Sequence, residues 1–261
     1  RVVIGEGERD DAPMLYIGEE MGNSESKLKI DIAVDPLECT NHCAKDLPDA
    51  LAVLAAAPRG ALLHAPDTYM NKLCGSSKLV GKVSLLNSVE ENLSLAAKAL
   101  EKNISDLKII VMDRDRHVSL IAKMKELNVE PILIGDGDVS GAIWAARPDG
   151  PFDLLMGIGA APEGVISAAA IRGIGGVFEG RLVFRSDEEE KRAEKMVDDN
   201  LERLWTANDL CKSDDAIFAA SGVCDGYLPG VILGNDSIQT FAELIDVRSG
   251  VVSRHDRTHS L

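Results

Sequence analysis

The sequence lacks an excess of positive charge, long apolar runs and paired cysteines, and each absence argues against a class of protein. Among its 261 residues, 28 are Lys or Arg and 43 are Asp or Glu, which gives a net charge of −15. A nucleic-acid binder needs a basic face, so we expect no nucleic-acid partner. No apolar run approaches the roughly 20 residues that cross a bilayer, so we expect no membrane span or membrane partner.

Cysteine and histidine form no recognisable framework. The odd number of cysteines, five, argues against a disulfide scaffold in a chain of this length. No CxxC or HExxH spacing occurs, so zinc is not expected. The sequence begins at Arg1 with neither a signal peptide nor a basic leader. We interpret it as a cytoplasmic protein, or a plastid protein if its source is eukaryotic, that has lost its N-terminal segment.

Short apolar runs alternate with helical patterns, which predicts a mixed α/β fold with helices on both faces of at least one sheet. A seam near residues 102–108 would separate a metal-bearing half, residues 1–105, from a second half, residues 106–261. The predicted strands are residues 2–4, 30–34, 51–55, 61–63, 109–112, 131–134, 154–156 and 216–220, with loose edge strands over 238–253. The predicted helices follow a capping box at Ser88 and Glu91, and also cover residues 116–127, 162–173 and 187–204.

Acidic side chains follow two of the predicted strands. In Gly5-Glu6-Gly7-Glu8 a carboxylate between glycines can enter a cleft, although an isolated motif of this kind is more often a polar turn. Asp35 and Glu38 lie on either side of a turn fixed by Pro36, where their carboxylates and the Leu37 carbonyl could converge on one cation. The alternative is an N-cap with Glu38 three residues on. Thr40 could orient a water, and amides after it could receive a phosphate.

A glycine-rich turn and a group of polar residues could bind the ligand. Gly157-Ile-Gly159-Ala-Ala-Pro162-Glu163 resembles a dinucleotide fingerprint, but Pro162 stands in place of the third glycine. Glu163 could reach a metal or could simply favour a helix start. Arg114 and Arg116 suit a phosphate, and the alternative is that they are simply solvated charges. Asp136 and Asp138 suit sugar hydroxyls, and the alternative for Asp138 is a helix cap. Tyr69 could contact the ligand, and the alternative is a structural tyrosine.

Five blocks of the sequence resemble those of the class II, GlpX-type fructose-1,6-bisphosphatases. They are VIGEGERDDAPMLYIGEE, DIAVDPLECTN, APDTYMNKL, DGDVSGAI and MGIGAAPEGVISAAAIR. They span most of the chain, in the family's order, and are most similar to the cyanobacterial branch that also accepts sedoheptulose-1,7-bisphosphate. The resemblance implies a layered αβαβα sugar-phosphatase fold, like that of fructose bisphosphatase and inositol monophosphatase. It also implies a homodimer or homotetramer.

The resemblance implies metal-dependent hydrolysis of the 1-phosphate of a sugar bisphosphate, in gluconeogenesis or the Calvin cycle. Mg²⁺ or Mn²⁺ would be held by Glu6, Asp35, Glu38 and Glu163 with the Leu37 carbonyl. Thr40, assisted by Glu6 and Asp35, would help the attacking water. The sugar bisphosphate would contact Tyr69, Arg114, Arg116, Asp136 and Asp138.

This sequence departs from the family pattern at several places. The family has a further N-terminal segment with a metal-binding Asp, and it has Gly where this chain has Cys39. Residues 45–49 differ, and the region after Val183 is shorter. These departures motivate one alternative, a non-catalytic relative that serves as an assembly or regulatory subunit. A second alternative keeps the fold but acts on an inositol phosphate or another sugar phosphate. A redox switch between Cys39 and Cys43 is a further hypothesis.

Overall fold

Two sheets organise the chain, and the first has seven strands. The structure, a computed structural model, describes residues 1–6, 14–197 and 199–261. Strand β1 is parallel to β2, and the other pairs of this sheet are antiparallel. In spatial order the strands are β1 (Val2–Ile4), β2 (Ile30–Glu38), β3 (Leu51–Pro58), β10 (Ile217–Gly222), β12 (Ser237–Asp246) and β11 (Ile232–Leu233), with β13 (Val252–Ser260) also paired to β12.

The second sheet has six strands and mixed direction. Strand β5 is parallel to its neighbours β6 and β7, whereas β4 is antiparallel to both β7 and β8. In spatial order the strands are β6 (Ile132–Ile134), β5 (Ile109–Met112), β7 (Leu154–Ala160), β4 (Tyr69–Gly75), β8 (Val177–Val183) and β9 (Trp205–Thr206).

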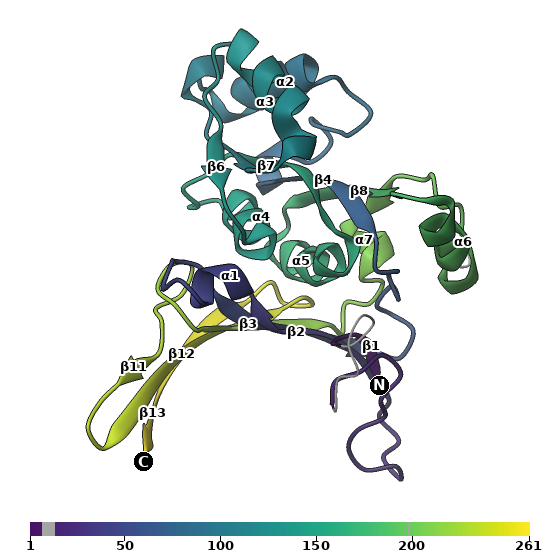
Figure 1. Cartoon of the computed structure of the whole chain (residues 1–261), viewed down its shortest axis with the longest axis vertical. Coiled ribbons are helices and arrows are strands. Elements are labelled where there is room, and N and C mark those ends of the chain that lie inside the picture. Colours follow the sequence, from purple (N-terminus) through teal and green to yellow (C-terminus); the bar gives the residue numbers. More distant parts are fainter. Residues whose placement is uncertain (7–13, 198) are drawn as a thin grey trace.

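Helices and sheets stack in layers (Figure 1). Helices α2 (Val89–Leu100) and α3 (Val118–Glu126) cover one face of the six-stranded sheet. Helices α4 (Asp138–Ala146) and α5 (Ala161–Ile174) lie between the two sheets. The mixed α/β expectation is therefore confirmed. In the described part of the chain, no helix covers the outer face of the seven-stranded sheet, so the outermost helical layer of an αβαβα arrangement has no counterpart there.

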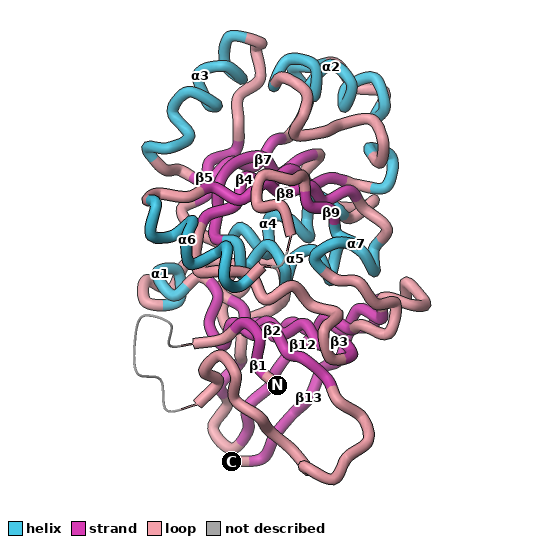
Figure 2. Tube along the Cα trace, turned by 90° about the vertical axis from the view of Figure 1, so that its right-hand side faces the viewer, coloured by secondary structure: helices cyan, strands magenta, loops and turns pink. Residues whose placement is uncertain are grey.

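The remaining helices are short or peripheral. They are α1 (Thr40–Cys43), α6 (Asp187–Met196), α7 (Ala207–Leu210) and three 3₁₀ turns, Ser77–Leu79, Ile104–Asp106 and Asp115–His117. Both termini lie beside the seven-stranded sheet (Figure 2). In the described ranges, no helix is long and apolar enough to cross a membrane.

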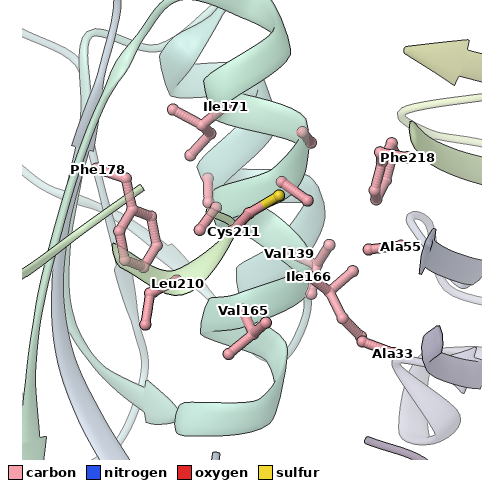
Figure 3. Packing of buried hydrophobic residues seen from close by; sticks show 14 of the residues in the cluster. Ala33, Ala55, Val139, Val165, Ile166, Ile171, Phe178, Leu210, Cys211 and Phe218 are labelled. Atoms are coloured by element: carbon pink, nitrogen blue, oxygen red, sulfur yellow. The ribbon is translucent and has the colours of Figure 1, made fainter. Parts of the chain in front are cut away.

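The core has two parts, one on each face of the six-stranded sheet. The larger lies around α4 and α5 between the sheets, and the smaller lies under α2 and α3. Figure 3 shows α5 in the larger part, with its Ile171 on the side of Phe178 from β8 and its Ile166 on the side of Ala33 from β2 and Phe218 from β10. Helix α5 can be buried on opposite sides because its sequence is apolar almost all round.

Several predicted elements need correction. Residues 61–63 do not form a strand. Leu62 makes only an isolated bridge with Cys211, because Cys211 is the residue that ends helix α7 and does not belong to a strand. Gly173 does not end α5. The helix ends at Gly175, which has a φ of 79°, and Gly173 instead permits close packing, since a Cβ there would lie 2.5 Å from Ile245 Cγ2. Helix α6 ends at Met196 rather than continuing to residue 204.

Other predicted elements are confirmed, but strands β4, β8, β9 and β11 were not predicted and β13 extends beyond the predicted range. Ser88 and Glu91 form the predicted capping box, with the Glu91 N–H donating to Ser88 Oγ at 3.1 Å. Strands β4 and β8 were not predicted because polar residues interrupt their apolar runs. Each sheet contains strands from both sides of residue 105, so the division into residues 1–105 and 106–261 stays a prediction.

Candidate active site

One large cavity, 760 Å³ in volume, opens where ends of the two sheets meet α1 and α5. Strand β2 delivers its acidic turn here, and β4 begins here with Tyr69, opposite Ala160 at the end of β7. The lining includes eight of the residues predicted from sequence, namely Glu6, Asp35, Leu37, Glu38, Thr40, Tyr69, Asp136 and Glu163. A cavity of this size is typical of small-molecule sites.

Three carboxylates converge on one side of this cavity. Asp35, Glu38 and Glu163 each offer an oxygen, and these oxygens all lie within 4.8 Å of one another. A β-bulge between Asp35 and Glu38 shifts the pairing of β2 with β3. Bulges redirect side chains, which explains how both carboxylates of this turn reach the same cavity. The Leu37 N–H donates to Asp35 Oδ1 at 3.0 Å and helps to fix the turn.

Burial and mutual repulsion disfavour the charged forms of these carboxylates. Burial, reinforced by the charge of Asp138, raises the pKa of Glu163 from 4.5 to about 7. Burial also raises the pKa of Asp35, and that of Glu38 well above its usual range. Asp35 and Glu38 lie close enough for each to affect the pKa of the other.

The cluster fits a divalent metal ion. Glu163 Oε2 is buried and has no hydrogen-bond partner among the described residues, so a cation would satisfy an otherwise orphaned acceptor. Carboxylate oxygens are the ligands that Mg²⁺ and Mn²⁺ prefer. A charge of two on the ion would also remove the repulsion that keeps the three carboxyls partly protonated. The cluster can therefore hold a metal ion.

Two other predicted metal ligands lie at the cavity but outside this cluster. Leu37 and Glu6 are lining residues. Glu6 is exposed, and its N–H donates to the Leu15 carbonyl at 2.9 Å in an isolated bridge with Tyr16. Their roles as ligands stay predictions. Gly7 and Glu8 of the same motif lie outside the described residues.

Thr40 is the first residue of α1, and its neighbour Cys39 has an unusual backbone. Thr40 is exposed and lines the cavity. Cys39 has a φ of 66°, in the left-handed region that glycine adopts without strain. Cys43 lies at the other end of α1, and a redox link between Cys39 and Cys43 stays a prediction.

Tyr69 lines the cavity, and two arginine side chains lie against its ring. The guanidinium carbon of Arg116 lies 4.6 Å from the centre of the Tyr69 ring, and that of Arg185 lies 4.7 Å from it. Arg116 is fixed by a bond from Nε to the Ile158 carbonyl at 2.9 Å. Arg114 donates to the Asp113 carbonyl. Neither Arg114 nor Arg116 is a lining residue of the cavity.

The two aspartates of the Asp136-Gly137-Asp138 motif have different surroundings. Asp136 lines the cavity. Asp138 is the first residue of α4, is 7% exposed, and accepts a 2.5 Å hydrogen bond from Lys72. Sequence reasoning missed Lys72 and Arg185. A lysine inside a segment that reads Met-Asn-Lys-Leu-Cys could have indicated Lys72, whereas no signal pointed to Arg185.

The fold and the site define an α/β protein with three converging carboxylates in one cavity that can hold a divalent cation. Residues 1–259 match the family model described as bacterial fructose-1,6-bisphosphatase, glpX-encoded. A relative from Synechococcus sp. (strain JA-2-3B'a(2-13)) is 42% identical over 284 residues, covering 99% of this chain and 82% of the relative. Another, from Prochlorococcus marinus (strain MIT 9312), is 43% identical over 259 residues, covering 94% of this chain and 78% of the relative. Both are named D-fructose 1,6-bisphosphatase class 2/sedoheptulose 1,7-bisphosphatase.

The chain therefore belongs to the glpX-encoded bacterial fructose-1,6-bisphosphatase family, a family of phosphatases. The predicted family is confirmed, and so is its enzymatic class.

Proposed function

We propose that this protein hydrolyses the 1-phosphate of fructose-1,6-bisphosphate, and that it also accepts sedoheptulose-1,7-bisphosphate. The observation that carries the proposal is the placement of three carboxylates within 4.8 Å of one another in the same cavity as Thr40 and Tyr69. A cation site and sugar-binding groups then face one space large enough for a sugar bisphosphate.

Asp35, Glu38 and Glu163 would hold Mg²⁺ or Mn²⁺, with Glu6 and the Leu37 carbonyl completing the coordination from the cavity wall. When bound, the ion would shield the phosphoryl oxygens and lower the pKa of the attacking water. The Thr40 hydroxyl, exposed at the start of α1, would hydrogen-bond to that water and orient it in line with the phosphorus–oxygen bond. The products are inorganic phosphate and the sugar monophosphate.

The rest of the substrate would extend toward Tyr69. Arg116 and Arg114 carry positive charge on that side and suit the distal phosphate, since a guanidinium binds phosphate oxygens in pairs. Arg185 lies against the same ring and adds a third cation. Asp136 and Asp138 would accept hydrogen bonds from the sugar hydroxyls. A second phosphate is therefore favoured over a strict monophosphate such as an inositol phosphate.

We also propose that the active form is a homodimer or homotetramer with a first half, residues 1–105, that supplies most metal ligands. The proposal rests on the family to which the chain belongs. Size-exclusion chromatography with light scattering measures the assembly directly, and a purely monomeric active enzyme would contradict it.

The test of the function is release of inorganic phosphate from fructose-1,6-bisphosphate with Mg²⁺ or Mn²⁺, and then with excess chelator. Glu163→Gln keeps the size of the side chain but removes its charge, and Glu126→Gln is the matched control on an exposed surface of α3. We expect metal-dependent turnover that is lost in Glu163→Gln and kept in Glu126→Gln. Absence of turnover in folded protein with either metal would refute the proposal and favour a non-catalytic subunit. Sedoheptulose-1,7-bisphosphate and fructose-6-phosphate, assayed in parallel, define the substrate.

A further inference from the structure

Lys72 is a fully buried lysine close to the acidic cluster. It lies in the middle of β4, and only 1% of its surface is exposed. Its Nζ lies 2.5 Å from Asp138 Oδ2. A lysine is almost never buried completely unless its charge is paired, because the loss of hydration is costly. The pair with Asp138 is therefore the reason that this ammonium can be placed here.

The surrounding backbone leaves room for this ion pair. A Cβ at Gly159, on β7, would lie 1.8 Å from Asp138 Oδ2 and 3.1 Å from Lys72 Nζ. A Cβ at Gly164, on α5, would lie 3.3 Å from Lys72 Cε. Any side chain at Gly159 would collide with the carboxylate. Two glycines on different elements thus create the space in which the lysine reaches the aspartate.

Asp138 also lies close enough to the cluster to affect it. The N–H of Val139, the next residue along α4, donates to Glu38 Oε1 at 3.4 Å, and the charge of Asp138 contributes to raising the pKa of Asp35, Glu38 and Glu163. A fourth carboxylate this close has two possible partners, the cation that the cluster would hold and the Lys72 ammonium. The described structure has it bonded to the ammonium.

We propose that Lys72 is a positioning residue that holds the Asp138 carboxylate away from the metal cluster and in place for a sugar hydroxyl. The proposal rests on the proposed function, since it assumes that the cluster binds a metal ion and that Asp138 binds substrate. Lys72 itself touches neither metal nor substrate. It separates the three carboxylates of the cluster, which line the cavity, from Asp138, which is 7% exposed and follows the lining residue Asp136 by two positions.

The experiment compares Lys72→Met with the parent protein. Met fills a similar volume without charge, which frees Asp138 to turn toward the cluster. Calorimetric titration with Mn²⁺ should show affinity that is higher by about tenfold or more, because a further carboxylate joins the site. The KM for fructose-1,6-bisphosphate should rise by about tenfold, because a hydrogen bond to the sugar is lost.

Two further variants separate positioning from simple loss of structure. Lys72→Met with Asp138→Asn removes both charges, so Mn²⁺ affinity should return to within about twofold of the parent while the KM stays raised. Lys123→Met is the matched control, since Lys123 forms an exposed pair with Glu126 at 3.1 Å, and it should change neither constant.

An unchanged or weaker Mn²⁺ affinity in Lys72→Met, with an unchanged KM, would overturn the proposal and leave Lys72 a purely structural residue. If Lys72→Met does not fold, the double variant provides the test. A Mn²⁺ affinity of the double variant that differs from that of the parent by more than about tenfold would then overturn the proposal. Failure of the proposed function is distinguishable, because parent protein without turnover still gives a Mn²⁺ affinity against which Lys72→Met is compared.

Discussion

Removal of the metal should make the stability of this protein fall as the pH rises through neutrality. In the chelated protein the three carboxyls of the cluster face one another without a cation. Burial raises the pKa of Glu163 from 4.5 to about 7, so the folded chain keeps its proton in a range where the unfolded chain has lost it. Folding therefore binds a proton between these two values, and the free energy of unfolding decreases with pH across that range.

The structure sets the size of this effect. Each pH unit between 4.5 and about 7 is equivalent to about 1.4 kcal/mol, so Glu163 alone lowers the free energy of unfolding by about 3 kcal/mol between pH 4.5 and pH 8. For a chain of this length that corresponds to a fall of roughly 6–12 °C in Tm. The raised pKa values of Asp35 and Glu38 act in the same direction.

Urea unfolding in excess chelator, at several values between pH 5 and pH 8 and at fixed ionic strength, measures this dependence. Glu163→Gln cannot ionise at this position, so it should be more stable than the parent at pH 8 by about 3 kcal/mol and similar to it at pH 5. Glu126→Gln should follow the parent at every pH. Saturating Mn²⁺ should remove most of the loss. A chelated parent whose difference from Glu163→Gln does not change with pH would refute the reasoning.

Three other substitutions test separate parts of the site. Asp35→Asn should weaken Mn²⁺ binding by about a hundredfold or more, because it removes a buried charge from the cluster, and unchanged affinity by calorimetry would contradict the ligand role. Cys39→Gly should raise the free energy of unfolding, measured in urea, by about 1 kcal/mol, because glycine adopts a φ of 66° without strain. Cys39→Ala keeps the Cβ and should give no such gain. Equal effects of the two substitutions would argue against backbone strain. Arg116→Met should raise the KM for the bisphosphate about tenfold with little change in kcat, and Arg116→Lys should restore it only partly, because lysine does not bind phosphate in pairs. An unchanged KM in Arg116→Met would place the distal phosphate elsewhere.

The apolar strands were predictable because each has a continuous run of apolar residues between turn signals. Strands β5 and β7 are examples, and α2 was predicted from its capping box. Strand β4 was not predictable in this way. Asn71 and Lys72 interrupt its run, and the burial of Lys72 depends on Asp138, which is 66 residues away in sequence. A local pattern cannot contain that partner.

The acidic part of the site followed from sequence because its residues are close together in local segments. The predicted strand end at residue 34 was wrong, since β2 runs on to Glu38, but Asp35 and Glu38 lie on either side of its bulge, and Glu163 lies in the first turn of α5. The arrangement around Tyr69 did not follow in the same way. Arg116 and Arg185, which contact its ring, are 47 and 116 positions away in the sequence. Glu6 was placed at the cavity correctly, but its distance from the cluster depends on packing that the motif does not specify.

The position of β4 has a consequence for the order in which the chain folds. Tyr69 pairs with Ala160 on one side and with Val183 on the other, so this strand has no partner in its sheet until β7, which ends at Ala160, has been made. Pairings of such long sequence separation slow folding, because the intervening chain must be closed into a loop first. Until then Lys72 has no counter-charge and is stable only in water. Most of the polypeptide will therefore have left the ribosome before the site can assemble. Until then the charge of Lys72, which is fully buried in the folded protein, keeps the unpaired β4 hydrated.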